Sequence, residues 1–264
     1  MGRAKFRECD HAFRDIARLL SHDRDTEVLT QTLAHLATEA QSTDDKTAVA
    51  DALEKLGTGQ LNGYAHSQAS ENIELAIATL QQVEHQIYSL EIKQPKMRTF
   101  AAGFAETYRD GRKTLRSAYR KMDDEAFHTF RKSLQHHWRH CQLLSPIWPE
   151  LMEVRVVAAR ELSQLIGLDH DLSLVTGYFR GDGSAHHQPH VRDCACTLAK
   201  MEQARIRSAA KPLAQRLYAL PASDMERLIF RLWPAAKNLA RDQHKTGATR
   251  AIVGPPALLV DGAN

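Results

Sequence analysis

The chain has 264 residues, of which 43% are hydrophobic and 25% are charged. This balance is typical of a folded protein with one large core or two smaller ones, and it excludes an intrinsically disordered chain. No run of about 18 apolar residues occurs, so no membrane-spanning helix is expected, and residues 1–7 lack the apolar core of a secretory signal. Four scattered cysteines favour a reduced, cytoplasmic protein over a disulfide framework or a metal site.

The first third of the sequence is expected to be helical. Its apolar residues recur with the period of a helix, and alternating strand patterns are nearly absent. In chain order we expect a helix over 6–20, a break at 21–24 and a helix capped by Asp25. A short helix capped by Asp44 or Asp45 is expected to end near Gly57. It is followed by a loop at 57–63 and by a long helix over 71–92 that Pro95 ends.

The remainder follows the same pattern up to a polar tail. We expect a helix over 97–122, a helix over 125–144 capped by Asp123 and Asp124, and a break bracketed by Pro146 and Pro149. The next helix is expected to stop at Gly167, after Ile166, and residues 169–171 are expected to open another. A polar loop at 181–189, helices over 192–220 and 224–242, and a disordered tail over 246–264 complete the chain.

Two segments of this chain resemble each other. Residues 19–28 and 165–174 both show an apolar helix end, a small residue, and an Asp-x-Asp motif expected to open a new helix. Together with the helical periodicity, the repetition predicts an all-α fold with two related helical bundles, one in each half of the chain. The bundles are expected over about 1–95 and about 97–242, within a single domain over 1–245.

Positive charge is concentrated in one part of the chain. The net charge is only +3, but residues 98–139 hold ten lysines and arginines against five acids. Local concentration of charge indicates binding, whereas the overall charge mainly affects solubility.

Two predicted helices each carry a basic row beside an apolar face. In the helix over 125–144 the row lies about a third of a turn from the apolar residues. Helices with so short a connection usually pack antiparallel, so both rows are expected to flank one groove. The rows share the spacing 0, 3, 4, 7, 11 and consist of His128, Arg131, Lys132, Gln135 and Arg139, and of Arg109, Arg112, Lys113, Arg116 and Arg120.

Neither row contains an acid that would neutralise it. Like charges four residues apart destabilise a helix by about 0.2–0.5 kcal/mol per pair, so the cations are expected to serve a partner. Arginine, which makes bidentate contacts to phosphate oxygens, outnumbers lysine in both rows. The rows therefore predict a surface for a linear polyanion. A weaker row on the first helix consists of Arg3, Arg7, Arg14 and Arg18, with His11 nearby.

Each feature also has an ordinary structural explanation. A single basic stripe is usually a solvated helix face, but two consecutive stripes of equal spacing favour binding. His128 is either a packed histidine or a phosphate contact. The remaining expectations place Phe130 and Trp138 in the core, His136, His137 and His140 at the surface, and Asp25 and Asp171 at helix N-caps rather than in salt bridges to an arginine.

These residues resemble a known family. The run 128–139, H-T-F-R-K-S-L-Q-H-H-W-R, resembles the H-x-x-R-K-x-x-K-x-x-W signature of the CHAD domain, the conserved histidine α-helical domain. The preceding Y-R-D-G-R-K at 108–113 is similar to the Y-x-x-G-R-K that leads into that signature, and the turns at 21–28 and 167–174 resemble two turns that recur in the family's halves. The similarity covers roughly residues 3–235.

The resemblance implies two four-helix bundles related by a pseudo-two-fold axis and a basic channel that binds inorganic polyphosphate. It also implies a cytoplasmic location at polyphosphate granules. The implied contacts come from the signature (His128, Arg131, Lys132, Arg139), from the preceding helix (Arg109, Arg112, Lys113, Arg116, Arg120) and from the first helix (Arg3, Arg7, Arg14). Binding without catalysis is expected, with no cofactor and no metal.

Two departures from the family pattern stand out. Gln135 occupies a position where the family usually has lysine. The family's first half also begins with a basic helix that bears its own histidine, and no H-x-x-R precedes the first helix of this sequence. Either that helix is missing from the chain, or the N-terminal bundle is incomplete.

Two other functions fit parts of the sequence. The His22-Asp23 and His170-Asp171 pairs are found in HD-type metal-dependent phosphohydrolases, which also need a separate histidine and a distal aspartate at the metal. A single-stranded nucleic-acid binder would use the same basic stripes. Such proteins usually expose aromatic side chains for base stacking, whereas here the aromatic residues are expected on the core side.

Overall fold

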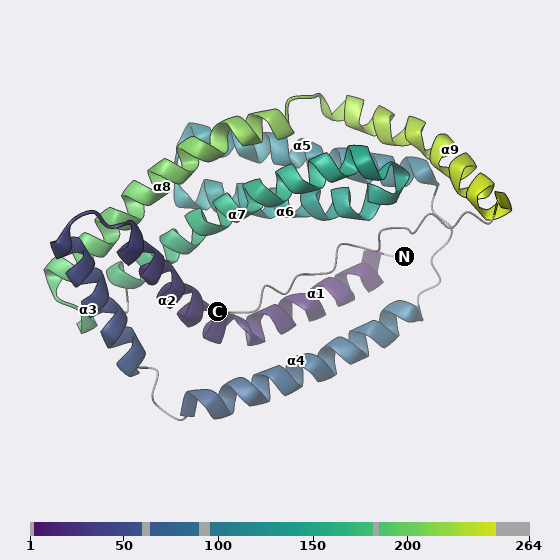
Figure 1. Cartoon of the computed structure of the whole chain (residues 1–264). Coiled ribbons are helices and arrows are strands. Elements are labelled where there is room, and N and C mark those ends of the chain that lie inside the picture. Colours follow the sequence, from purple (N-terminus) through teal and green to yellow (C-terminus); the bar gives the residue numbers. More distant parts are fainter. Residues whose placement is uncertain (1–2, 60–63, 90–95, 182–184, 247–264) are drawn as a thin grey trace.

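The computed structural model describes residues 3–59, 64–89, 96–181 and 185–246, and their regular structure is helical, which confirms the all-α prediction (Figure 1). The expected tail beyond Thr246 lies outside the described residues, as do residues 60–63 and 182–184 of the expected loops. The elements are α1 (Arg3–Leu19), α2 (Ser21–Glu39), α3 (Thr43–Gly59), α4 (Tyr64–Tyr88), α5 (Met97–Lys121), α6 (Asp124–Leu144), a 3-10 turn η1 (Ser145–Ile147), α7 (Pro149–Arg180), α8 (Pro189–Leu217) and α9 (Ala222–Thr246).

The turn between α5 and α6 forms as the sequence predicts. Met122 adopts a left-handed conformation with φ 57° and donates its N–H to the Ala118 carbonyl. Asp123 then caps α6 by accepting a hydrogen bond from the N–H of Ala126 at 2.7 Å. This tight connection sets α5 and α6 side by side, so the two basic rows begin close together in the chain.

Two other caps and one break differ from expectation. Ser42, rather than Asp44 or Asp45, caps α3, because its Oγ accepts the N–H of Asp44 at 3.2 Å. The two aspartates lie in the first turn instead, where negative charge favours the helix dipole. Helix α2 starts at Ser21, so Asp25 lies inside the helix and does not cap it. The break expected at 21–24 reduces to Leu20.

Gly167 does not end a helix, because α7 runs without interruption from Pro149 to Arg180. A glycine inside a helix costs only about 1 kcal/mol relative to alanine. The residues on both sides of it are fully buried, Leu162 and Ile166 before it and Leu172 after it, so packing offsets that cost. Asp171 is consequently an interior residue of α7, and its predicted N-cap role is wrong.

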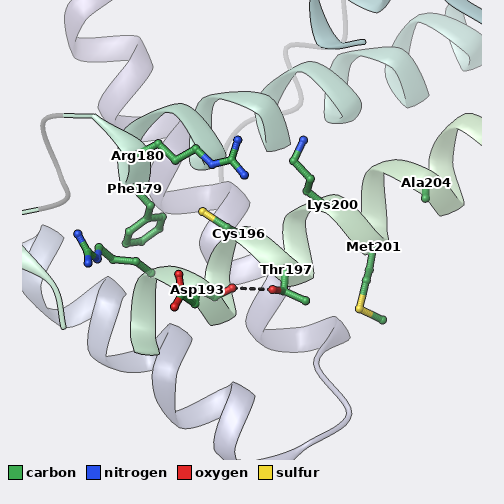
Figure 2. Close-up of a pocket in the computed structure, with 9 residues that line it drawn as sticks. Phe179, Arg180, Asp193, Cys196, Thr197, Lys200, Met201 and Ala204 are labelled. Atoms are coloured by element: carbon green, nitrogen blue, oxygen red, sulfur yellow. Dashed lines mark hydrogen bonds between the residues drawn. The ribbon is translucent and has the colours of Figure 1, made fainter. Parts of the chain in front are cut away.

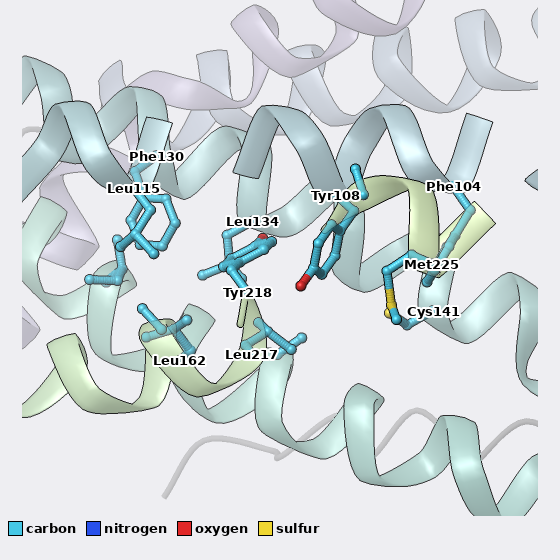
Figure 3. Close-up of a cluster of buried hydrophobic side chains, with 14 of the residues drawn as sticks. Phe104, Tyr108, Leu115, Phe130, Leu134, Cys141, Leu162, Leu217, Tyr218 and Met225 are labelled. Carbon is cyan, nitrogen blue, oxygen red and sulfur yellow. The ribbon is translucent and has the colours of Figure 1, made fainter. Parts of the chain in front are cut away.

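The buried residues form two hydrophobic clusters that share α7 and α8. The first lies among α5, α6, the first half of α7, the end of α8 and the start of α9 (Figure 3). The second lies among α2, α3, the second half of α7 and the first half of α8. The predicted division into an N-terminal and a C-terminal bundle stays a prediction.

The first cluster encloses a histidine that was expected at the surface. His137 is fully buried, with its ring centroid 5.0 Å from that of Phe104 and 5.2 Å from that of Tyr108. Burial, with smaller contributions from Arg155 and His140, lowers the pKa of His137 to about 3. Tyr218 completes this layer by packing where Gly111 leaves room, since a Cβ at Gly111 would lie 2.3 Å from the Tyr218 Oη.

The other residues of this region follow the prediction more closely. Phe130 is fully buried, as expected. Trp138 is only partly buried, because it packs at the edge of the core with the Arg139 guanidinium 4.6 Å from its ring centroid. His136 is exposed, and the half-buried His140 places its Nδ1 3.3 Å from the Thr107 Oγ1 on α5.

Helices α1 and α4 form a pair at one side of the molecule (Figure 1). Ile16 on α1 and Ala76 and Val83 on α4 are buried between them. Among the described residues, no helix combines the length and the apolar character that a membrane crossing requires.

Candidate functional site

The basic row of α6 lies along the edge where α6 meets α7. His128 stacks on His170 of α7, with ring centroids 4.4 Å apart and an interplanar angle of 27°. One turn further along, Arg131 crosses Gly167, where an added Cβ would lie 4.0 Å from the arginine Nε. Lys132 and Arg139 project beyond this contact and are exposed. The row therefore has a packed inner edge and a solvent-facing outer edge.

The pKa of His128 is lowered by partial burial and by the cations beside it. Partial burial lowers its pKa, the Lys132 and Arg131 charges lower the pKa further, and Glu125 opposes the shift. The imidazole is therefore held neutral near pH 7 in the free protein. An anion placed against this row would oppose the two cations and favour the protonated imidazole.

The basic row of α5 is mostly exposed. Arg109, Lys113, Arg116 and Arg120 are exposed, and Arg112 is half-buried. The neighbouring Tyr119 packs against α8, because its Oη donates to the Arg207 carbonyl at 2.7 Å and its ring centroid lies 5.4 Å from the Lys211 Nζ.

Helix α6 contacts α5 and α7 through different residues, and the groove expected between the two basic rows stays a prediction. Helix α6 meets α5 on the side of His140, which approaches Thr107, and it meets α7 on the side of His128 and Arg131.

The cations of these rows are largely left without acids. Within the described parts of the chain, no ion pair joins an acid to Arg109, Arg112, Lys113, Arg116, Arg120 or Lys132. Arg139 donates to the Gln142 amide oxygen at 3.1 Å, a neutral partner. Positive charge on both rows thus remains available to an external anion.

The row on α1 is partly neutralised. Arg14 pairs with Asp10 at 3.0 Å and Arg18 with Asp15 at 2.8 Å, both on exposed positions. Such exposed pairs contribute little and separate readily when a stronger anion arrives. Arg7 is exposed, while the side chain of Arg3 lies outside the described residues.

A third basic surface was missed in the sequence. Arg180 at the end of α7 and Arg192 and Lys200 on α8 line an open pocket of about 850 Å³. Figure 2 shows Arg180 and Lys200 extending into the same space above Cys196. Arg192, Cys196 and Lys200 are spaced four residues apart, a signal that these residues share one helix face. Asp193 is the one acid among the lining residues.

A buried ionic network connects this pocket to the start of α6. Arg207 on α8 donates through Nε to Asp169 of α7 at 2.6 Å and through Nη2 to Asp124 of α6 at 2.6 Å. It also covers the Phe127 ring at 4.2 Å and donates to the Met122 carbonyl. Lys200 reaches the other oxygen of Asp124 at 3.8 Å. The two acids and two cations of the network balance each other.

The pKa values of the two acids move in opposite directions. The Asp124 pKa is lowered, because hydrogen bonds and charge from Arg207 and Lys200 outweigh the effect of burial. Deeper burial dominates at Asp169 and raises its pKa despite the same arginine. Asp169 thus depends most on Arg207 for its charge.

The residues of the two His-Asp pairs do not form a common site among the described residues. His170 stacks on His128, and Asp171 is an interior residue of α7. The side chains of His22 and Asp23 lie outside the described residues. Among the side chains that the structure does describe, no three His, Cys, Asp or Glu residues group as metal ligands.

Comparison with known proteins gives one match. The family model of the CHAD domain matches residues 1–180, which include α6 and end at the last residue of α7. No curated protein and no solved structure matches the chain. The pocket residues on α8 lie outside the matched segment.

Proposed function

Since this chain belongs to the CHAD domain family, we propose that it binds inorganic polyphosphate through the basic row of α6, without catalysis. The observation that carries the proposal is the edge between α6 and α7. Arg131 is seated over Gly167 there, His128 stacks on His170, and Lys132 remains exposed. A fixed inner edge with free cations outside it suits a flexible chain of phosphates.

Helix α1 is proposed to supply a second set of cations. Phe13 lines a cavity with Ile77 and Leu80 of α4, so this face of α1 is turned towards α4. Arg7 and Arg14 are turned about 100–120° from Phe13 around the helix axis. Figure 1 places α1 between α4 and the α6–α7 pair. This arrangement supports a polyphosphate path bordered by α6 on one side and α1 on the other.

The α7–α8 pocket extends this path beyond the first turn of α6. Asp124 stands between His128 and Lys200, but Arg207 and Lys200 offset its charge. The acid therefore does not interrupt the positive surface, and phosphates can continue towards Arg180 and Arg192. The α5 row is proposed as a separate contact face for the same polymer or for a second one.

The placement of the aromatic residues favours polyphosphate over single-stranded nucleic acid. Phe104, Tyr108, Phe127 and Phe130 have at most 1% of their surface exposed. Base stacking on aromatic side chains provides about 1–3 kcal/mol per base in single-strand binders, and these rings do not offer it. We extend the proposal to a cytoplasmic location at polyphosphate granules.

Replacing Arg131 and Lys132 together by alanine is expected to weaken polyphosphate binding and to reduce its salt dependence. Each phosphate contact on a single-stranded polyanion contributes about 0.7 to the slope of log K against log salt. Losing two cations should therefore flatten the slope by about one to two units. The measurement is a series of titrations with fluorescently labelled polyphosphate at increasing salt.

The matched control is Arg109→Ala with Lys113→Ala, which removes the same charge from the basic row of α5. If α6 is the main contact, the control retains a steeper slope than the α6 variant. An unchanged slope in the α6 variant would remove Arg131 and Lys132 from the site.

A further inference from the structure

The α1–α4 pair exposes a continuous strip of large apolar side chains. The strip runs along both helices beside the face where they meet, and its members are between 37% and 81% exposed. Phe13, Ile77, Leu80, Ile87 and Tyr88 surround a cavity of about 490 Å³ that opens to solvent. We name this surface the α1–α4 strip, and it comprises Phe6, Phe13, Ile73, Ile77, Leu80, Ile87 and Tyr88.

Exposed apolar residues are ordinary when scattered, but a contiguous patch usually marks an interaction surface. This strip follows the length of a helix pair that lies apart from the two main hydrophobic clusters, which contain no residue of α1 or α4. A pair of helices with an uncovered apolar side is half of a four-helix arrangement. Two more helices would cover the strip.

The charges on the two helices are opposite. Helix α1 has five basic and three acidic residues, a net of +2. Helix α4 has three acids, Glu71, Glu74 and Glu84, and no lysine or arginine, a net of −3. In a two-fold arrangement each α1 would face the α4 of the other copy, so that attraction adds to the burial of apolar surface.

We infer that the α1–α4 strip is a homodimer interface, in which two copies of this chain join their α1–α4 pairs into an intermolecular four-helix bundle. The arginine row of α1 stays open in such a dimer, since Arg14 is turned about 100° from Phe13 around the helix axis. The inference is independent of polyphosphate binding and applies to the protein without ligand.

The test is the molar mass of the full chain in solution, measured by sedimentation velocity over a range of concentrations without polyphosphate. The expected result is a dimer for the unmodified protein. Phe13→Asp with Ile77→Asp should raise the dimer Kd at least about tenfold, because charge would be buried at the centre of the interface. Glu84→Lys, which leaves the apolar side chains in place, should weaken the dimer by removing attraction to α1.

Phe230→Asp is the matched control, since Phe230 is exposed to a similar degree on α9. It should leave the dimer intact, and circular dichroism should show equal helix content in all variants. A monomeric unmodified protein, or a dimer that persists in Phe13→Asp with Ile77→Asp, would overturn the inference. A monomer that binds an apolar dye only after removal of residues 247–264 would instead assign the strip to the chain's own C-terminal segment.

Discussion

Replacing Arg207 by methionine is expected to lower the free energy of unfolding by about 3–5 kcal/mol. The guanidinium is the shared partner of Asp169 and Asp124, and its side chain is 8% exposed. Methionine retains most of the side-chain volume over Phe127 but leaves the buried Asp169 without its counter-charge. Urea denaturation followed by circular dichroism at pH 7 measures the loss.

The second half of this test uses a double variant. If the loss arises from an unpaired buried charge, Asp169→Leu in the Arg207→Met background should recover part of the stability, because an apolar pair can replace an ionic one. Arg216→Ala, at an exposed position of the same helix, should change the stability by no more than about 0.5 kcal/mol. A stability of Arg207→Met equal to that of the unmodified protein would contradict the assigned role of the network.

Protonation of His137 is expected to destabilise the protein steeply in acid. Its pKa is about 3 in the folded chain, against an ordinary value of 6.5. The unfolded chain therefore takes up this proton first, and the free energy of unfolding falls as the pH decreases below 6.5. The loss from this group approaches about 1.4 kcal/mol for each pH unit between 6.5 and about 3.

His137→Leu removes this titration and should flatten the pH dependence of stability below pH 6.5 relative to the unmodified protein. The difference between the two proteins isolates His137 from the carboxylates that both contain. His136→Leu, at the neighbouring exposed position, should leave the pH dependence unchanged. Parallel curves for His137→Leu and the unmodified protein between pH 4 and 6.5 would show that the imidazole is not buried in its neutral form.

Local signals in the sequence were enough to predict most helices. The cap at Asp123 and the ends of α5 and α6 depend on a few neighbouring residues, so the sequence pattern predicts them correctly. The expectation that Gly167 ends a helix is wrong, because packing of its neighbours against other helices stabilises α7 by more than the glycine costs. His137 was misjudged for a related reason, since the aromatic cluster around it is assembled from α5, α6 and the residue Tyr218.

The candidate site shows the same limit. Membership of the basic rows follows from helical spacing, and the absence of internal acid partners could be read from the residues within each row. Which neighbour each row faces depends on tertiary contacts such as the stacking of His128 on His170 and the approach of Thr107 to His140. The pocket is lined by Arg180 of α7 and by Arg192 and Lys200 of α8. The spacing of residues along α8 could indicate only the two cations of that helix.

The central claim is that cations on α6 bind a chain of phosphates, and a salt series of polyphosphate titrations with the unmodified protein tests it most directly. Three α6 cations, each contributing about 0.7, predict a slope of log K against log salt of about −2 or steeper. Single-stranded RNA of equal charge should compete weakly, because Phe127 and Phe130, the phenylalanines of α6, are buried and offer no ring for base stacking. Absence of binding at low salt, a slope near zero, or equal competition by RNA would contradict the account.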